Sequence, residues 1–397
     1  MAGEIQLNTT TLATESSGSI TLSNVDSATN RTNLGLGSIA TQNANAVAIT
    51  GGSVSGASIV PTSPFSFTNK IINGNFDIWQ RGTSQTSSGY GSADRWNNDH
   101  SGSSKTASQQ AFTLGQTEVP GNPKYYLRHV VTSVSGAGNY CLTQQKIEGV
   151  STLAGKTATL SFWAKADSNK NIATEFSQDF ATGGSPSSSV TGIGVTTHSL
   201  TTSWQKFTTT VSIPSISGKT LGTNGNDYLH LIIWFDAGST YNSRTNSLGN
   251  QSGTFDIAQV QLEEGTVATP FEHRPYGLEL SLCQRYYQEY GYGKNGATAD
   301  LTFASGMWYA STEVFVIPQL PVLMRSAPTI TVPSVTNGYR FHKNSSYLDL
   351  STFTYVGGWD GRSGMIGTTS ASGGTGGHAT WLSMRVSGAS IKFYAEL

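Results

Sequence analysis

The sequence is poor in charge and in long hydrophobic runs. Asp, Glu, Lys and Arg make up 12% of its 397 residues, about half the usual fraction, and the formal net charge is −1. A chain so close to neutrality has no extended field to attract nucleic acid or an anionic membrane, so neither partner is expected. No segment has the apolar length of a membrane span. Residues 1–14 lack the basic and apolar regions of a signal peptide, so none is expected there.

Signatures of catalysis and of metal binding are also missing. The seven histidines are isolated, and the sequence has no CxxC, HxxxH, GxSxG, Walker or dinucleotide-binding motif. Glycoside hydrolysis requires two carboxylates that flank one bond, but the adjacent Glu263 and Glu264 point to opposite faces of a strand. The two cysteines, Cys141 and Cys283, are far apart and are expected to be free, buried thiols of a protein made in a reducing cytoplasm. We therefore expect a protein that is not an enzyme.

Glycine is abundant, with 45 residues, and Ser, Thr and Asn are plentiful, which favours an all-β fold with many turns. In residues 255–262, hydrophobic residues alternate, but the phase slips once at Ala258-Gln259, which predicts a strand with a bulge. We expect residues 70–275 to form one domain of about eight antiparallel strands in two sheets. Further expected strands are 124–134, 139–147, 157–166, 203–213 and 228–235.

One helix is expected, at residues 277–290, where Leu278, Leu282, Tyr286 and Tyr290 recur every four residues. Strand-like segments follow it and continue to the end of the sequence. Residues 276–397 are therefore expected to hold this linking helix and a second, smaller β-sandwich.

Three stretches resemble one protein family: 69–82 (NKIINGNFDIWQRG), 93–96 (ADRW) and 255–290 (FDIAQVQLEEGTVATPFEHRPYGLELSLCQRYYQEY). They are similar to bacteriophage tail-fibre and receptor-binding proteins, in which a jelly roll like that of carbohydrate-binding modules precedes such a helix. The resemblance implies a virion protein, made in the host cytoplasm, that attaches the phage to a host surface polysaccharide. A structural spacer or adaptor without glycan binding is the alternative, and a capsular depolymerase is a third hypothesis.

Residues 1–69 lack aromatic residues until Phe65, and their apolar residues are sparse and regularly spaced, as at Ile49, Val54 and Ile59. A single chain with so little apolar surface cannot offset its ordering entropy, whereas three chains around one axis share their apolar residues. The segment also resembles tail-fibre shafts. We expect a homotrimeric shaft whose N-terminal end binds baseplate or tail proteins; a disordered linker is the alternative.

Sugars stack their C–H faces on aromatic rings and hydrogen-bond to polar side chains, so aromatic residues beside turns are candidates for glycan binding. Trp163 points away from the predicted core face of its strand, but the resemblance implies that it is buried. Trp204 is expected to be a core residue. The candidate ligand-binding residues are Tyr90, Tyr241, Tyr339 and, in a glycine-flanked loop, Trp359, Asp360 and Arg362.

No organic cofactor is expected. Carbohydrate-binding jelly rolls often hold a structural Ca²⁺ between their first and last strands, and the resemblance implies Asn75, Asp77 and Asp256 as its ligands. The same residues also suit the capping of turns.

Overall fold

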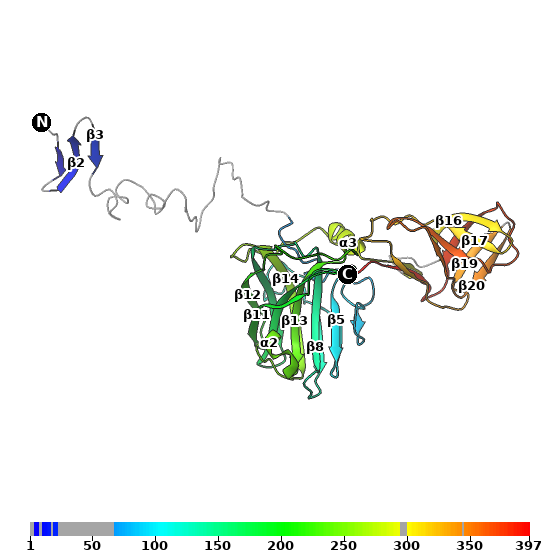
Figure 1. Ribbon diagram of the computed structural model, residues 1–397, viewed down its shortest axis with the longest axis horizontal. Coiled ribbons are helices and arrows are strands. Elements are labelled where there is room, and N and C mark those ends of the chain that lie inside the picture. Colours follow the sequence, from blue (N-terminus) through cyan, green and yellow to red (C-terminus); the bar gives the residue numbers. More distant parts are fainter. Residues whose placement is uncertain (1–3, 8–9, 17–18, 23–66, 294–299, 344) are drawn as a thin grey trace. The chain divides into compact units, whose positions relative to one another are not determined.

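The computed structural model describes residues 4–7, 10–16, 19–22, 67–293, 300–343 and 345–397. The chain divides into two compact units, residues 1–63 and 64–397. In the first unit, strands β1 (Glu4–Leu7), β2 (Thr10–Ser16) and β3 (Ser19–Leu22) form an antiparallel sheet. Most of the expected shaft, residues 23–66, lies outside the described residues. The second unit holds the jelly roll and the C-terminal domain (Figure 1).

The jelly roll consists of two antiparallel sheets that enclose one hydrophobic core, which includes Phe162, Leu231 and Phe255. The five-stranded sheet has the order β11 (Val190–Leu200), β10 (Lys170–Asp179), β13 (Tyr228–Ala237), β8 (Tyr140–Glu148) and β5 (Asn97–Ser101). The six-stranded sheet has the order β12 (Gln205–Ser212), β9 (Thr157–Ala166), β14 (Gly253–Glu264), β7 (Tyr125–Thr132), β6 (Ser104–Ala111) and β4 (Ser84–Gln85). The all-β prediction is confirmed.

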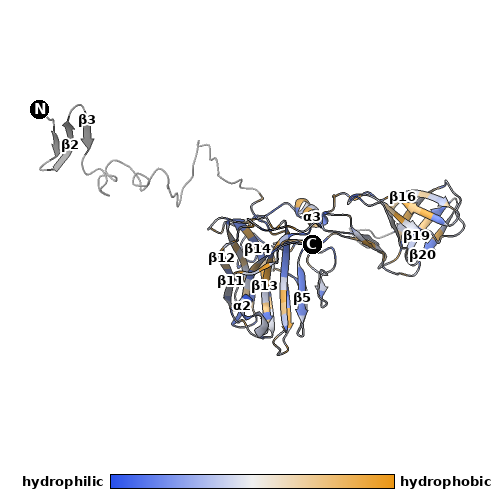
Figure 2. Ribbon diagram, in the orientation of Figure 1, coloured by the Kyte–Doolittle hydropathy of each residue, from blue (hydrophilic) through white to orange (hydrophobic). Residues whose placement is uncertain are grey.

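The sequence analysis missed strands that carry few hydrophobic residues. Figure 2 shows the contrast between hydrophobic β13 and polar β5. In β10, Glu175 and Gln178 are fully buried although both are polar: Glu175 Oε1 accepts a hydrogen bond from Trp234 Nε1, and Gln178 Nε2 donates one to the carbonyl oxygen of Pro214. A polar strand between two paired neighbours is stabilised by ladder hydrogen bonds and local networks, so it does not need a clean hydrophobic alternation.

The predicted bulge in β14 is confirmed. The pairing of β14 with β9 shifts register between Ala258 and Gln261, and Gln259 adopts a left-handed conformation with φ of 50°. The extra residue allows Ile257 and Val260 to remain buried in the same core on either side of the slip.

The predicted helix is wrong in its length. Helix α3 spans Tyr276–Gln284, Tyr286 lies in the turn after it, and Tyr290 belongs to strand β15 (Tyr287–Gly291), which pairs with β24 (Ser390–Tyr394). The buried residues of α3 are Glu279 and Cys283, whereas Leu282 is half-buried. The four-residue repeat does not mark a longer helix, because Tyr286 is buried in the turn after α3, where its ring lies against the Arg95 guanidinium and its hydroxyl donates to Glu148.

A short helical turn, η2 (Ser239–Tyr241) and α2 (Asn242–Thr245), follows β13. Both cysteines are free and buried, as predicted. Among the helices of the described residues, none has the length and apolar character to span a membrane.

The C-terminal domain is also built from two sheets around one core, which includes Trp308, Tyr339 and Phe393. The small sheet has the order β15, β24 and β18 (Thr329–Thr331). The large sheet has the order β20 (Ser346–Leu350), β19 (Tyr339–Lys343), β23 (Ala379–Met384), β16 (Leu301–Ala310), β17 (Glu313–Val316), β22 (Met365–Thr368) and β21 (Tyr355–Gly357).

Candidate functional site

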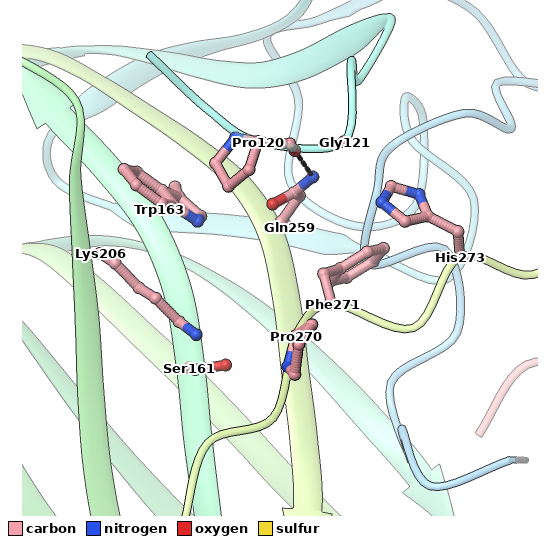
Figure 3. A pocket seen from close by; sticks show the side chains of 9 residues that line it. All are labelled: Pro120, Gly121, Ser161, Trp163, Lys206, Gln259, Pro270, Phe271 and His273. Atoms are coloured by element: carbon pink, nitrogen blue, oxygen red, sulfur yellow. Dashed lines mark hydrogen bonds between the residues drawn. The ribbon is translucent and has the colours of Figure 1, made fainter. Parts of the chain in front are cut away.

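The outer face of the six-stranded sheet carries a pocket of about 260 Å³ (Figure 3). Three strands form its floor: β9 supplies Ser161 and Trp163, β12 supplies Lys206, and β14 supplies Gln259. Two loops form its walls, one at Pro120 and Gly121 and the other at Pro270, Phe271 and His273.

The alternation of β9 places Trp163 in this pocket. Leu160, Phe162 and Ala164 point into the core, so Ser161 and Trp163 lie on the opposite face. The half-buried Trp163 packs beside a small apolar cluster that includes Val119 and Trp204. The burial that the resemblance implies for Trp163 is only partial, because that cluster covers only part of its surface.

The bulge in β14 places Gln259 at the floor of the pocket. The Gln259 Nε2 atom donates a hydrogen bond of 2.7 Å to the carbonyl oxygen of Pro120. Figure 3 shows its side-chain oxygen turned toward Trp163. The amide is thus held by one loop, and its oxygen is left to accept a hydrogen bond from a ligand.

The wall at Phe271 is anchored through Glu272. The Glu272 carboxylate accepts hydrogen bonds from the backbone nitrogens of Phe67 (2.6 Å) and Asn69 (2.8 Å), and its own backbone nitrogen donates to Gln261 Oε1 (2.8 Å). The rings of Phe271 and His273 contact each other edge to face, with centroids 5.0 Å apart. The wall is therefore held in place before any ligand binds.

This arrangement is suited to binding a polar ligand that also has apolar faces. Two aromatic rings offer apolar faces, and the amide, hydroxyl and ammonium groups around them offer hydrogen bonds, which is the combination that sugar recognition requires. The pocket lining contains no carboxylate pair of the kind that glycoside hydrolysis needs. Within the described residues, no group of three or more His, Cys, Asp or Glu side chains could hold a metal ion.

Three of the four predicted ligand residues of the C-terminal domain make contacts within the domain, and the fourth is exposed. Tyr339 is fully buried, and its hydroxyl lies within hydrogen-bonding distance of the carbonyl oxygens of Pro333 (2.7 Å) and Ser390 (3.0 Å). The half-buried ring of Trp359 packs on Phe393, with centroids 5.2 Å apart. Asp360 accepts hydrogen bonds from the backbone nitrogens of Arg362 and Ser363, both 2.9 Å, and so closes its own loop. The side chain of Arg362 is exposed.

The two predicted ligand residues of the jelly roll lie apart from the pocket. Tyr90 is half-buried, and the guanidinium of Arg81 lies 5.3 Å from the centre of its ring. Tyr241 is half-buried on the outer side of the five-stranded sheet, where it contacts Trp234 and Tyr140 with ring centroids 5.0 and 5.4 Å apart. The structure therefore does not bring the six predicted residues together into one site.

The predicted calcium ligands do not all meet. Asn75 Nδ2 donates to Asp77 Oδ2 at 2.8 Å, and burial raises the pKa of Asp77. Asn75 Oδ1 is buried without a hydrogen-bond partner. Asp256, in contrast, forms a bidentate pair with Arg128, with distances of 2.7 and 2.8 Å. Asn75 and Asp77 form one polar cluster and Asp256 another, so any calcium site needs a ligand other than Asp256. Calcium binding itself stays a prediction.

Comparisons with known proteins returned only distant structural likenesses. No family model and no curated protein matches the chain. A CBM4 structure is 18% identical, with a TM-score of 0.27, and the match covers 49% of this chain and 98% of the CBM4 chain. A family 11 carbohydrate-binding module from Clostridium thermocellum, in complex with a mixed-linked tetrasaccharide, is 11% identical with a TM-score of 0.28, covering 47% and 98%.

The enzymatically active domain of tailspike protein 4 from bacteriophage CBA120 is 12% identical with a TM-score of 0.29, covering 50% of this chain and 22% of its own. Likenesses at these TM-scores carry no argument about function, which is therefore inferred from the geometry of the pocket.

Sequence reasoning missed Phe271 and Gln259 as pocket residues. Phe271 lies in a turn-rich exit between two prolines, a composition that indicates a connection and not a site. Two signals were available: the outward phase of Trp163 in β9, and the bulge that puts Gln259 on the same outer face. Neither signal shows that residues 270–273 fold back over the sheet.

Proposed function

We propose that this protein is a bacteriophage tail fibre that attaches the virion to a host cell-surface glycan, and that the pocket at Trp163 binds the glycan. The observation that supports binding is the half-buried Trp163 ring in a pocket with the polar groups of Ser161, Lys206 and Gln259 around it. The virion role rests on the tail-fibre motifs in residues 69–96 and 255–290.

A pocket of this size binds a sugar weakly, with a dissociation constant of about 1 mM, or about 4 kcal/mol. Three copies on one fibre raise the effective affinity, because the second and third contacts form at a high local concentration. We propose a homotrimer, attached to baseplate or tail proteins through residues 1–30. Sedimentation of the full-length chain as a monomer at micromolar concentration would contradict this.

The binding proposal is tested with the full-length variants Trp163→Ala and Phe271→Ala. Each should reduce binding to host cells and to purified host polysaccharide at least tenfold, because each removes a stacking surface worth about 1.4 kcal/mol or more. Tyr309→Ala is the matched control, since Tyr309 is 69% exposed on the C-terminal domain. Wild-type binding by Trp163→Ala, at an unchanged melting temperature, would refute the assignment of the pocket.

The two alternatives give different results in the same assays. A structural spacer would bind virion proteins but neither cells nor polysaccharide. A depolymerase would release new reducing ends from the polysaccharide. The Arg362 loop of the C-terminal domain is a second candidate for recognition, because the Arg362 side chain is exposed while Asp360 holds the backbone nitrogen of Arg362.

A further inference from the structure

The only lysine of the pocket lies directly beside its tryptophan. Lys206 of β12 and Trp163 of β9 are paired residues in the antiparallel ladder, so their side chains emerge side by side on the outer face. Figure 3 shows the Lys206 side chain extending from the Trp163 side of the pocket toward Ser161 and Pro270. A sugar ring stacked on Trp163 would therefore have the ammonium group at its edge.

In the described part of the chain, no carboxylate neutralises this ammonium group. Nζ of Lys206 makes a long hydrogen bond of 3.4 Å to the carbonyl oxygen of Thr269, and no ion pair joins it to a carboxylate among the residues that the structure describes. The carboxylate of Glu263, in β14, also contacts Thr269, but it accepts hydrogen bonds from Thr269 Oγ1 (2.7 Å), the Thr269 backbone nitrogen (2.9 Å) and Gln261 Nε2 (2.9 Å).

The opposite end of the pocket is also without a negative charge. The lining residues at that end are Gly121, Phe271 and His273. The adjacent Glu272 does not line the pocket, and its carboxylate accepts hydrogen bonds from the backbone nitrogens of Phe67 and Asn69. The pocket lining thus contains one lysine, one histidine and no acidic residue.

We propose that the pocket selects acidic polysaccharides, with a sugar carboxylate accepting a charge-assisted hydrogen bond from Lys206 while the same or the neighbouring sugar ring stacks on Trp163. This inference rests on the proposed glycan binding and adds the chemical class of the glycan. A carboxylate on the ligand supplies the acceptor that the lysine lacks, and such bonds are about twice as strong as neutral ones. A neutral sugar would leave the lysine bound only to Thr269 and to water.

The test compares acidic bacterial capsular polysaccharides with the same polymers after chemical reduction of their carboxyl groups. Reduction keeps the linkages and the ring hydroxyls and converts each carboxylate into an uncharged primary alcohol. We expect the full-length wild-type protein to bind native polymers about tenfold more tightly than reduced ones. The preference should weaken as NaCl rises from about 0.05 to 0.5 M, because Lys206 is exposed and its charge is screened.

Lys206→Gln should lose the preference for native polymers, so that it binds native and reduced polymers with equal affinity. Lys165→Gln is the matched control: Lys165 lies two residues after Trp163 in β9, and its Nζ is 5.2 Å from the centre of the Trp204 ring, outside the pocket. It should keep the wild-type preference.

The possible outcomes separate the two proposals. In one outcome, the wild type binds native and reduced polymers equally, and Trp163→Ala abolishes both. That result would overturn the proposal of an acidic glycan and leave the proposal of glycan binding in place. A preference that survives in Lys206→Gln would overturn the role of Lys206. If the protein binds none of the acidic polymers, their reduced forms or neutral bacterial polysaccharides, both proposals are overturned.

Discussion

The guanidinium of Arg81 lies 2.7 Å from the carboxylate of Glu396, although 315 residues separate them in the sequence. Arg95 forms a second ion pair with the same carboxylate. The rings of Tyr287 and Tyr286 lie against these two guanidinium groups, 3.8 and 3.5 Å from ring centre to guanidinium carbon. Residues beyond β24 thus anchor the C-terminal domain to the jelly roll.

Glu396→Gln should destabilise this part of the protein by about 3–5 kcal/mol, because it removes the shared anion of two buried cations and leaves Arg81 only a longer contact of 3.8 Å to Asp94. The arginine side chains are only 4% and 1% exposed, so water cannot replace the lost charge. The measurement is urea-induced unfolding of the full-length protein.

The matched control for that experiment is Glu264→Gln. Glu264 pairs with Lys156 at 3.2 Å, but both side chains are more than half exposed. Its loss should cost less than about 1 kcal/mol. Similar, small losses for both variants would show that the Glu396 pairs contribute little to stability.

The protein should lose stability in mild acid because three histidines of the jelly roll are buried. Burial lowers the pKa of His198 to about 4 and of His230 to about 3, and it lowers that of His129 well below its usual value. Unfolded histidines take up protons as the pH falls through about 6.5, while the folded ones do not. Stability is therefore complete above pH 6.5 and falls below it, by up to about 1.4 kcal/mol per pH unit for each histidine.

Buried acids act in the opposite direction. Burial raises the pKa of Asp94 and of Glu279, so their contribution is present in acid and is lost as the pH rises through the raised values. The net loss of stability is expected between pH 6.5 and 5, where the histidines titrate in the unfolded chain. Urea midpoints measured at pH 7, 6 and 5 test this.

His129→Phe should make the same pH dependence shallower. Both ring nitrogens of His129 are buried without a hydrogen-bond partner, and the ring stacks on Phe235 with centroids 4.5 Å apart. Phenylalanine preserves the stack and removes the group that titrates. The expected change is a slope lower by up to about 1.4 kcal/mol per pH unit below pH 6.5. Identical slopes in the wild type and the variant would exclude His129 as a source of acid sensitivity.

Helix α3 provides a pair of adjacent substitutions with opposite expectations. Cys283 is fully buried, so Cys283→Asp places a carboxylate without a partner in the interior and should cost several kcal/mol or prevent folding. Leu282 is half-buried, so Leu282→Asp should cost only about 1 kcal/mol. Thermal unfolding and soluble yield decide, and a larger loss for Leu282→Asp would mean that the opposite helix face is covered.

In the C-terminal loop, Arg362→Ala is the informative variant. Trp359→Ala removes a ring that packs on Phe393 and lies so close to Gly364 that a Cβ there would be 2.6 Å from it. The variant should therefore destabilise the domain by about 2 kcal/mol. Arg362→Ala should leave the melting temperature unchanged, and we expect wild-type cell binding if the Trp163 pocket is the receptor site. Loss of binding at an unchanged melting temperature would move recognition to this loop.

Several features follow from local sequence alone. The alternation in residues 157–166 and 255–262 identified β9 and β14, and the phase slip at Ala258-Gln259 identified the bulge. These predictions succeeded because a strand's two faces repeat every two residues, so the periodicity of a short segment reports which side is buried.

The pocket, by contrast, depends on segments that are distant in sequence. Trp163 lines a pocket only because loops at residues 119–121 and 270–273 pass over the outer face of its sheet. The same limit applies to Tyr339 and Trp359, whose positions beside turns predict ligand binding: whether such a ring is covered depends on Ser390 and Phe393, from another strand. Local periodicity shows which face of a strand is buried. The pairing order of the strands and the paths of the loops decide what covers that face. Both are set by the packing of the whole domain.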